Sequence, residues 1–320
     1  MTGVARNARA VRRGRGFVLV NALVLVAALA AAAALLLARA EAGRARLGAG
    51  LEAAQLKLNL DAFEALAATL LARDTGAVDH AGEAWARPVD PVPLARGTVA
   101  GKITDLQGRF NINWLADPSD TTAQAAFDRL AERLGVPAAA GTAIRAALAP
   151  DGPPDPAAWL RLTPPETPVG GALLMRDQLA RIPGLSPRAL DRLTPFVTAL
   201  PADSTLNVNT AAPEVLAAFL PHLPPAALAR LLRDRPRDPW RSIEAFQAAA
   251  GLAQADTEEE ETDAPDAATL PAERLSVGSS WFRAEITATL AGRQVHRSTV
   301  LHRRGAPATV TPAWRLTRWP

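Results

Sequence analysis

The 320-residue chain contains no cysteine. Disulfide bonds, thiolate metal ligands and thiol nucleophiles are therefore excluded, although the compartment is not defined by this absence. Histidine is scarce, and none of the four copies lies in a metal-binding spacing such as H-E-x-x-H. They are His80, His222, His296 and His302. The chain also lacks a G-x-S-x-G elbow, a Walker loop and a dinucleotide fingerprint, so we expect no enzymatic activity.

Strong net charge is also missing, since the formal value is +3 and arginines are mixed with acids through most of the chain. This balance predicts no nucleic-acid partner. The basic excess is local: five arginines and no acid occupy residues 1–16, a bias that holds a segment on the cytoplasmic side of a bilayer. Hydrophobic residues make up 49% of the chain, enough for a conventional core, and 27 prolines predict many short helices with enforced ends.

Residues 17–38 form an unbroken apolar run with a single polar residue, Asn21. A helix needs about 20 residues to cross a hydrocarbon core of about 30 Å, so the run is predicted to span a membrane. Helical periodicity continues through residues 39–75, which predicts one long helix that becomes amphipathic outside the membrane. The expected apolar face consists of Leu47, Leu51, Leu58, Phe63, Leu66 and Leu70.

The order of basic leader, glycine, phenylalanine and membrane helix resembles the amino terminus of type IV pilins and pseudopilins. In that family a prepilin peptidase cuts on the cytoplasmic side between the glycine and the phenylalanine. The resemblance implies a cleaved leader over residues 1–16, with the cut between Gly16 and Phe17. An unprocessed single-span anchor is the alternative interpretation of this segment.

Asn21 departs from the usual pattern of that family, which has glutamate at the fifth mature position. The carboxylate would neutralise the terminal ammonium of a neighbouring subunit at low dielectric, and an amide cannot. Within the family, lack of this glutamate is characteristic of the large minor pseudopilin K of type II secretion systems. We therefore interpret Asn21 as a marker of position in the filament.

Residues 98–115 alternate like a strand, offer a turn at residues 105–108 and resume at Arg109, which predicts a hairpin. Residues 76–93, rich in proline and small polar residues, are predicted to be a connecting loop. Within residues 98–115, the segment 105–113 resembles the pseudopilin K pattern D-x-x-G-R-F-N-x-N. The matching residues are Asp105, Gly108, Arg109, Phe110, Asn111 and Asn113.

From residue 116 to residue 255, short helical patterns are separated by proline or glycine, which predicts an all-helical unit. Within it, Thr210 is predicted as a helix N-cap, with Glu214 in the first turn, where a carboxylate suits the helix dipole. This stretch resembles a second pseudopilin K pattern, N-x-N-T-A. The matching residues are Asn207, Asn209, Thr210 and Ala211.

A rival interpretation comes from residues 182–193, which look like a helix-hairpin-helix turn of DNA-uptake proteins. Such hairpins donate backbone hydrogen bonds to phosphate, and basic residues add affinity. Only Arg188 and Arg192 are available, and Asp191 partly offsets them. A helix pair used for packing is the favoured interpretation.

The final region, residues 256–320, begins with an acidic run and returns to strands, with a hairpin expected around residues 291–293. Residues 276–283 resemble the closing strands of pseudopilin K. Because pseudopilins of that family bind calcium, the acidic run is a candidate calcium site, although a solvated linker is its commonest meaning. The candidate ligands are Asp256, Glu258, Glu260, Asp263 and Asp266.

Taken together, the resemblance covers nearly the whole chain and identifies it as a member of the pseudopilin K family. It implies an α+β, pilin-like fold in which a long helix packs on a small antiparallel sheet. The expected divisions are a leader (1–16), a membrane segment (17–38), an amphipathic helix (39–75), a first pilin-like part (76–115), a helical insertion (116–255) and closing strands (256–320).

The family also implies a function. Minor pseudopilin K would form a tip complex with minor pseudopilins I and J on a short periplasmic filament and promote export of folded proteins. Other expected partners are the remaining pseudopilins, the inner-membrane assembly platform, the prepilin peptidase and the inner membrane itself, with the globular part in the periplasm. A tip pilin of a related type IV pilus is a further alternative.

Overall fold

The structure is a computed structural model, and it describes residues 13–74, 76–233, 235, 237–252, 272–305 and 307–319, with side chains from residue 17 onward. The chain divides into two compact units, Met1–Leu58 and Asn59–Pro320, and each is described by itself.

The first unit consists, in its described part, of helix α1 (Arg13–Arg73), whose last residues belong to the second unit. Within the described residues, α1 is the one helix that is long and apolar enough to cross a membrane. The apolar side chains of its amino-terminal part are exposed, as expected of a lipid-facing segment, and Asn21 is exposed among them. The prediction of one long helix is confirmed, and the helix ends two residues before the expected position.

The predicted apolar face of the amphipathic part is largely wrong. Leu47, Leu51, Leu58 and Leu66 are exposed, and only Phe63 of the predicted set is fully buried. The buried stripe in the second unit consists of Leu60, Phe63, Ala67 and Leu71. Leucine occurs all around this helix, so the choice of face comes from the sheet it contacts, a long-range effect that local periodicity does not contain.

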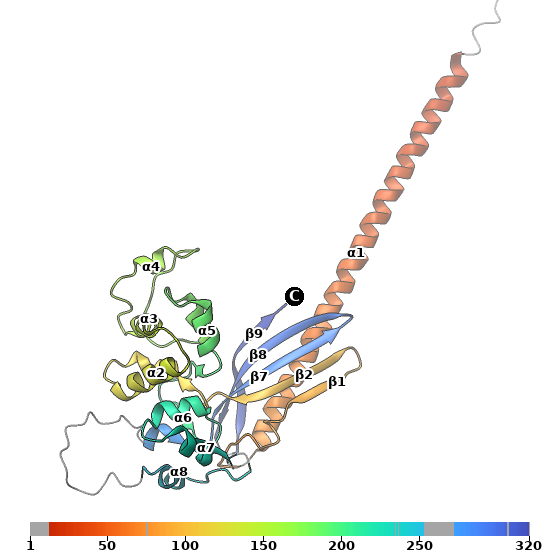
Figure 1. The fold of residues 1–320 in the computed structure, drawn as a ribbon. Coiled ribbons are helices and arrows are strands. Elements are labelled where there is room, and N and C mark those ends of the chain that lie inside the picture. Colours follow the sequence, from red (N-terminus) through yellow and green to blue (C-terminus); the bar gives the residue numbers. More distant parts are fainter. Residues whose placement is uncertain are drawn as a thin grey trace, which may run out of the picture. The chain divides into compact units, whose positions relative to one another are not determined.

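The second unit contains a five-stranded antiparallel sheet with the order β1-β2-β7-β8-β9 (Figure 1). Its strands are β1 (Val89–Pro93), β2 (Thr98–Asp105), β7 (Trp281–Leu290), β8 (Arg293–Arg304) and β9 (Thr309–Arg318). The end of α1 packs on one face, where Gly101 lies so close to Phe63 that a Cβ at this glycine would come within 2.6 Å of the ring. The predicted pilin-like α+β fold is confirmed.

The first predicted hairpin is wrong. Strand β2 pairs with β1 and β7, whereas Phe110–Asn111 forms a separate strand, β3, that pairs in parallel with β4 (Val197–Thr198). Phe110 is fully buried among aromatic rings of the helical region, and this packing removes the segment from the sheet. Strand β1 lies in the predicted loop, and the prediction did not include β9. The second hairpin is confirmed, with Ala291 and Gly292 at the turn between β7 and β8.

The two faces of the sheet differ because side chains alternate along each strand. On the face toward α1, Phe282, Ala284, Ile286 and Ala288 of β7 are buried. The intervening residues lie on the opposite face. There Trp281 stacks on His302 of β8, and Val300 packs against Leu200 of the helical region.

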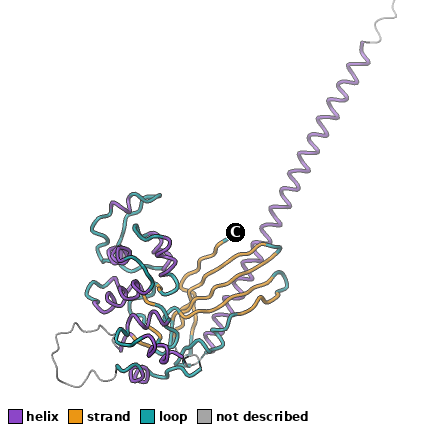
Figure 2. Tube along the Cα trace, viewed as in Figure 1, coloured by secondary structure: helices purple, strands orange, loops and turns teal. Residues whose placement is uncertain are grey.

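The helical region lies between β2 and β7, so the chain leaves the sheet at residue 106 and returns at residue 281 beside the strand it left (Figure 2). An aromatic cluster at its core includes Phe110, Trp114, Phe127 and Phe219. A second short parallel pair joins β5 (Leu206–Asn207) to β6 (Leu275–Ser276). The α-helices are α2 (Thr121–Arg133), α3 (Ala138–Leu148), α4 (Ala157–Leu160), α5 (Pro187–Leu193), α6 (Pro213–Phe219), α7 (Pro225–Arg233) and α8 (Ile243–Ala249). The 3-10 helices are η1 (Ile112–Ala116), η2 (Arg176–Arg181) and η3 (Ala272–Arg274).

Candidate functional site

The predicted motif residues occupy three places. Asn111 and Asn113 form one polar cluster inside the helical region. Asn207, Asn209 and Thr210 join Asp105 at the point where the chain passes between sheet and helical region. The remaining motif residues have separate surroundings.

The first asparagine pair clamps two distant loops. The Asn111 side chain accepts from the backbone N–H of Asn113 (3.2 Å) and of Leu200 (3.0 Å), and it donates to the carbonyls of Leu200 (3.2 Å) and Pro201 (2.9 Å). The Asn113 side chain accepts from the N–H of Leu173 (2.8 Å) and donates to the carbonyls of Leu173 (2.9 Å) and Leu200 (2.8 Å). Both side chains are buried and use donors and acceptors together.

The second pair repeats this geometry. The Asn207 side chain accepts from the N–H of Asn209 (2.9 Å). The Asn209 side chain accepts from the N–H of Trp240 (2.9 Å) and donates to the carbonyls of Trp240 (2.9 Å) and Val277 (3.3 Å). In both pairs the first asparagine holds the backbone two residues on, and the second binds both backbone groups of one loop residue.

We call these pairs the first clamp (Asn111 and Asn113) and the second clamp (Asn207 and Asn209). Each begins at the second residue of a two-residue strand that is paired in parallel with a distant strand. An amide is needed because it offers donor and acceptor at once, whereas an aspartate would offer only acceptors. The sequence shows the asparagines but not their partners, most of which are backbone groups that carry no sequence signal; Asn207 also donates to the side chains of Asp105 and Ser279.

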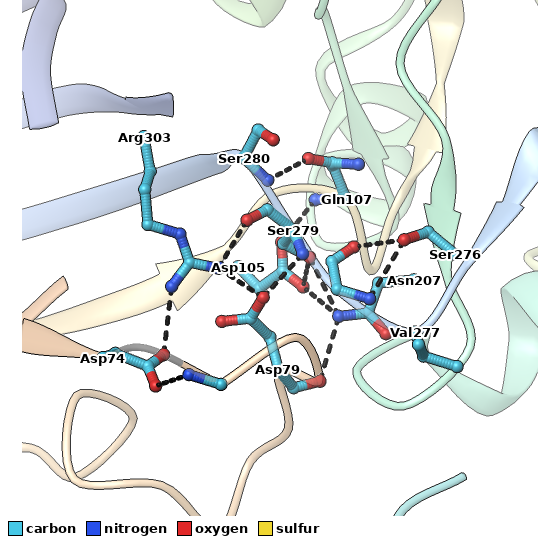
Figure 3. A network of polar contacts seen from close by, with 12 residues as sticks. Asp74, Asp79, Asp105, Gln107, Asn207, Ser276, Val277, Ser279, Ser280 and Arg303 are labelled. Carbon is cyan, nitrogen blue, oxygen red and sulfur yellow. Dashed lines mark hydrogen bonds and ion pairs between the residues drawn. The ribbon is translucent and has the colours of Figure 1, made fainter. Parts of the chain in front are cut away.

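Asp105, at the end of β2, is the centre of a buried network (Figure 3). Its carboxylate accepts from Gln107 N–H (2.7 Å), Ser279 Oγ (2.6 Å), Asn207 Nδ2 (3.1 Å) and Thr210 Oγ1 (2.5 Å). Burial raises the pKa of Asp105, and these hydrogen bonds oppose that rise. The network therefore joins the sheet to the second clamp.

Asp79 and Arg303 extend the same network. Asp79 accepts from Ser279 N–H (2.6 Å) and from Arg303, whose guanidinium also donates to Asp74 (3.0 Å) and to the Ser279 carbonyl (2.7 Å). Burial raises the pKa of Asp79 to about 7, and the charge of Asp105 adds to the rise, while Arg303 and the Ser279 N–H oppose it. No sequence pattern marks Asp79, Gln107, Ser279 or Arg303 as members of a site. Residues of these types are common on protein surfaces, and only the fold brings these four side chains together.

Asp74, Asp79 and Glu83 place ligand-type oxygens within 4.8 Å of one another, the arrangement that a cation could use. Arg303 already pairs with two of these carboxylates, and Glu83 accepts from Trp85 Nε1 (2.7 Å). The guanidinium thus supplies the positive charge at this cluster.

Gly108 is required by close approach. A Cβ at this position would lie 2.6 Å from the carbonyl oxygen of Thr210, and the Gly108 carbonyl accepts from Ala212 N–H (3.1 Å). The two motifs therefore contact each other directly at this glycine.

The predicted N-cap at Thr210 is wrong. Ala212 occupies the N-cap position of α6 and offers no side-chain acceptor, while Thr210 Oγ1 donates to Asp105. Glu214 does lie in the first turn of α6. Ala211 is fully buried in the helical core.

Phe110 and Arg109 point to different surroundings. Phe110 stacks on Phe219 with ring centroids 5.7 Å apart. Arg109 donates to the carbonyl of Thr194 (3.4 Å), and burial lowers its pKa, with the charge of Arg176 adding to the effect. Phe110 therefore contributes to the packing of the helical region, whereas Arg109 lies near a second arginine, Arg176.

The processing residues Gly16 and Phe17 lie in α1, with the Phe17 side chain exposed. The five acidic calcium candidates lie outside the described residues. In the helix-hairpin-helix segment, Arg192 donates to the Gly135 carbonyl, while Arg188 is exposed. The segment before the turn, η2, is a 3-10 helix rather than an α-helix.

The histidines have local roles. His302 stacks on Trp281, His296 contacts Thr287 (2.9 Å), and His222 contacts the Ala250 carbonyl (3.3 Å). His80 accepts from Gly82 N–H (3.2 Å). In the described part of the chain, these contacts join none of the four rings to the Asp105 network.

Comparison with known proteins identifies the family. Two family models described as "Type II secretion system (T2SS), protein K" match residues 108–202 and 206–267. A type II secretion system protein K from Pseudomonas aeruginosa is 31% identical over 258 residues, covering 74% of this chain and 77% of the relative. The chain belongs to the type II secretion system protein K family.

Other relatives agree. The protein K of Pectobacterium carotovorum is 25% identical over 323 residues, covering 93% of this chain and 95% of the relative. That of Aeromonas hydrophila is 31% identical over 200 residues, which are 54% of this chain and 60% of the relative. The predicted family is confirmed. It is a family of minor pseudopilins, which are structural secretion components, and its membership together with the apolar helix supports a membrane-anchored protein with a globular part.

A solved structure shows the same fold. One chain of the GspK-GspI-GspJ complex from enterotoxigenic Escherichia coli matches with a TM-score of 0.72 and 23% identity, covering 86% of this chain and 100% of that chain. The two family models also fall on the two clamps: the first contains Asn111 and Asn113, and the second contains Asn207 and Asn209. Each family match therefore contains one of the two clamps.

Proposed function

We propose that this chain caps the periplasmic pseudopilus of a type II secretion system. In this role it forms a tip complex with minor pseudopilins I and J and promotes export of folded proteins through the outer membrane. The observation that carries the proposal is the helical region inserted between adjacent strands of a pilin-like sheet, in a member of the protein K family. The fold it shares with a chain from a GspK-GspI-GspJ complex supports the choice of partners.

The physical argument is steric. Subunits along a narrow helical filament must fit side by side, and the helical region, residues 106–280, adds a second body to the sheet of the pilin-like part. Only the end of a filament leaves room for such a subunit. We further propose that the chain acts by assembly rather than catalysis, because the carboxylates of the Asp105 network are used in joining the sheet to the helical region.

Co-purification tests the tip assignment. Full-length chain in detergent should retain minor pseudopilins I and J of the same system through size exclusion, and it should not retain the major pseudopilin to the same extent. Failure to retain either I or J would contradict the proposal.

Processing is a second element of the proposal. Prepilin peptidase should cut between Gly16 and Phe17, and mass spectrometry of the membrane-extracted protein should find Phe17 at the new amino terminus. Asn21→Glu should leave both insertion and cleavage intact, because the residue at this position acts in subunit contacts. Loss of cleavage in Asn21→Glu would contradict the interpretation of Asn21 as a mark of the tip.

Calcium remains a proposal for the acidic run. Carboxylates suit this ion, which takes six to eight oxygen ligands. Full-length protein should melt at higher temperature in millimolar calcium chloride than in magnesium chloride. A variant with all five acids changed to their amides (Asp256, Glu258, Glu260, Asp263 and Asp266) should lose the difference, and an unchanged difference would reject this segment.

Two other functions are less favoured. A tip pilin of a related type IV pilus would share the fold, and partner choice in the co-purification separates it from the secretion subunit. For a DNA receptor, the helix-hairpin-helix segment offers Arg188 as an exposed base, since Arg192 is bonded to the backbone. Salt-sensitive retention on DNA-cellulose above that of a charge-matched protein would favour the receptor.

A further inference from the structure

A cavity of about 500 Å³ lies on the face of the sheet opposite α1. Strands β2, β7, β8 and β9 contribute to its lining, and η2 of the helical region contributes Arg176 and Asp177. Part of the wall is apolar, with Trp314 and Leu316 of β9. A volume of this size accommodates several side chains, far more than a single small ion.

Arg283, on β7, is the unusual residue of this cavity. Its side chain lines the cavity, yet the residue is only 4% exposed. Its Nε is buried and has no hydrogen-bond partner in the described part of the chain. A buried guanidinium N–H without an acceptor is costly, and an incoming carboxylate would relieve that cost.

The acids that line the cavity are already paired. Asp177 accepts from Arg176 (3.2 Å) and from Arg318 (3.3 Å), and Glu285 pairs with Lys102 (2.9 Å). Each therefore has a cationic partner before Arg283 is considered.

Additional arginines increase the positive potential around Arg283. Arg109 and Arg176 donate to the same carbonyl, that of Thr194 (3.4 and 3.2 Å). Burial, together with the charges of Arg176 and Arg109, lowers the pKa of Arg283 to about 10, against the opposing charges of Glu285 and Asp177. The guanidinium remains charged at neutral pH and stands in a field that favours an added negative group.

We propose that this cavity binds an acidic side chain carried on an apolar peptide segment of another protein, with the Arg283 guanidinium receiving the carboxylate. The planar guanidinium matches a carboxylate in a two-pronged hydrogen bond, and removal from water strengthens the pair. The apolar wall formed by Trp314 and Leu316 fits the residues that flank the acid. The cavity volume favours a peptide segment over a free anion.

This inference goes beyond the proposed function, because it concerns a docking site and does not depend on subunits I and J. Co-purification could fail while the cavity still binds acidic peptides, and the reverse is also possible. The two tests are therefore independent.

The test is calorimetric titration of the full-length protein in detergent with the capped peptide acetyl-Leu-Ala-Glu-Ala-Leu-amide. The control peptide has Gln in place of Glu. We expect at least about tenfold weaker binding of the Gln peptide, because it leaves the arginine charge unpaired. Equal affinity for the two peptides, or no binding of either, would overturn the proposal. Sodium acetate that binds as tightly as the Glu peptide would also overturn it, since a free anion would then suffice.

Arg283→Met locates the site. The variant should bind the Glu peptide no better than the Gln peptide, and its melting temperature should stay close to that of the unsubstituted chain because an unpaired charge has been removed from the interior. Arg230→Met makes the same chemical change at an exposed position of α7 and should leave the preference for Glu intact. A folded Arg283→Met that keeps the preference would overturn the proposal. A large drop in its melting temperature would also do so, because Arg283 would then be structural.

Discussion

The two faces of the sheet both carry arginines, but they differ in how these are paired. On the face toward α1, Arg315 pairs with Glu64 through Nε and Nη2, and Arg297 pairs with Asp61 (2.5 Å). On the opposite face, Arg283 is as buried as Arg297, and its Nε has no hydrogen-bond acceptor among the described residues. Burial alone therefore does not distinguish an arginine that holds the fold together from one that is available to a partner; the acceptors around it do.

The largest effect should follow from removing the acceptor on the α1 face. Glu64→Ala leaves Arg315 and the Thr299 hydroxyl without their partner and weakens the surroundings of Arg297, so we expect a loss of about 3 kcal/mol in the free energy of unfolding. Denaturant titration of the full-length protein measures it. Glu132→Ala, at an exposed position of α2, should change stability by less than about 0.5 kcal/mol. Similar losses in both would show that the α1-face pairs contribute little.

The second largest effect concerns the end of the same face, where the Asp105 network closes. Asn207→Ala removes donors to Asp105, to Ser279 and to the Asp79 carbonyl, leaving buried acceptors unsatisfied. We expect a loss of about 2 kcal/mol, measured by the same titration. Arg188→Ala, which changes an exposed residue of the helical region, is the control. A loss no larger than that of the control would contradict a structural role for the network.

The third effect depends on pH. Burial raises the pKa of Asp79 from an ordinary value of 3.8 to about 7, so the folded state binds more protons than the unfolded state between these values. This group therefore reduces stability as pH rises from about 4 to about 7. Asp79→Asn does not titrate, and its stability relative to the unsubstituted chain should improve over that range. A constant difference across thermal melts at pH 4, 5.5 and 7 would refute the assignment.

The smallest effect belongs to the pair that lies on the opposite face and is open to solvent. Lys102 and Glu285 are 2.9 Å apart, with side chains 56% and 44% exposed. A double-mutant cycle with Lys102→Met and Glu285→Gln should give a coupling of about 0.2 to 1 kcal/mol, reduced by added salt. A coupling as large as that of Glu64 with Arg315 would remove the contrast between the faces.

Several features could be predicted from the sequence because their causes are local. The long helix follows from an unbroken apolar run, and the second hairpin from alternating residues around Ala291 and Gly292. The motif residues were recognised from their resemblance to two pseudopilin K patterns.

Other features have non-local causes. Strand β3 leaves the sheet because Phe110 packs against Phe219, a residue more than one hundred positions away. The hydroxyl of Thr210 likewise donates to a distant residue, Asp105, rather than capping α6. In the sequence Arg283 looks like any strand arginine, and the missing acceptor at its Nε, among the described residues, depends on which acids the fold brings near it and on their other partners.

Insertion of the helical region between adjacent strands has a consequence for the order of folding. Asp105 and Phe282 are paired neighbours in the sheet although 177 residues separate them. Closing so long a loop costs little more free energy than closing a shorter one, because the entropy grows only with the logarithm of loop length, but such distant pairing is slow. The helical region has a hydrophobic core of its own and can form first, which shortens the effective distance between the two strand ends. In this order of folding the sheet is completed last, when the helical region brings β2 and β7 together.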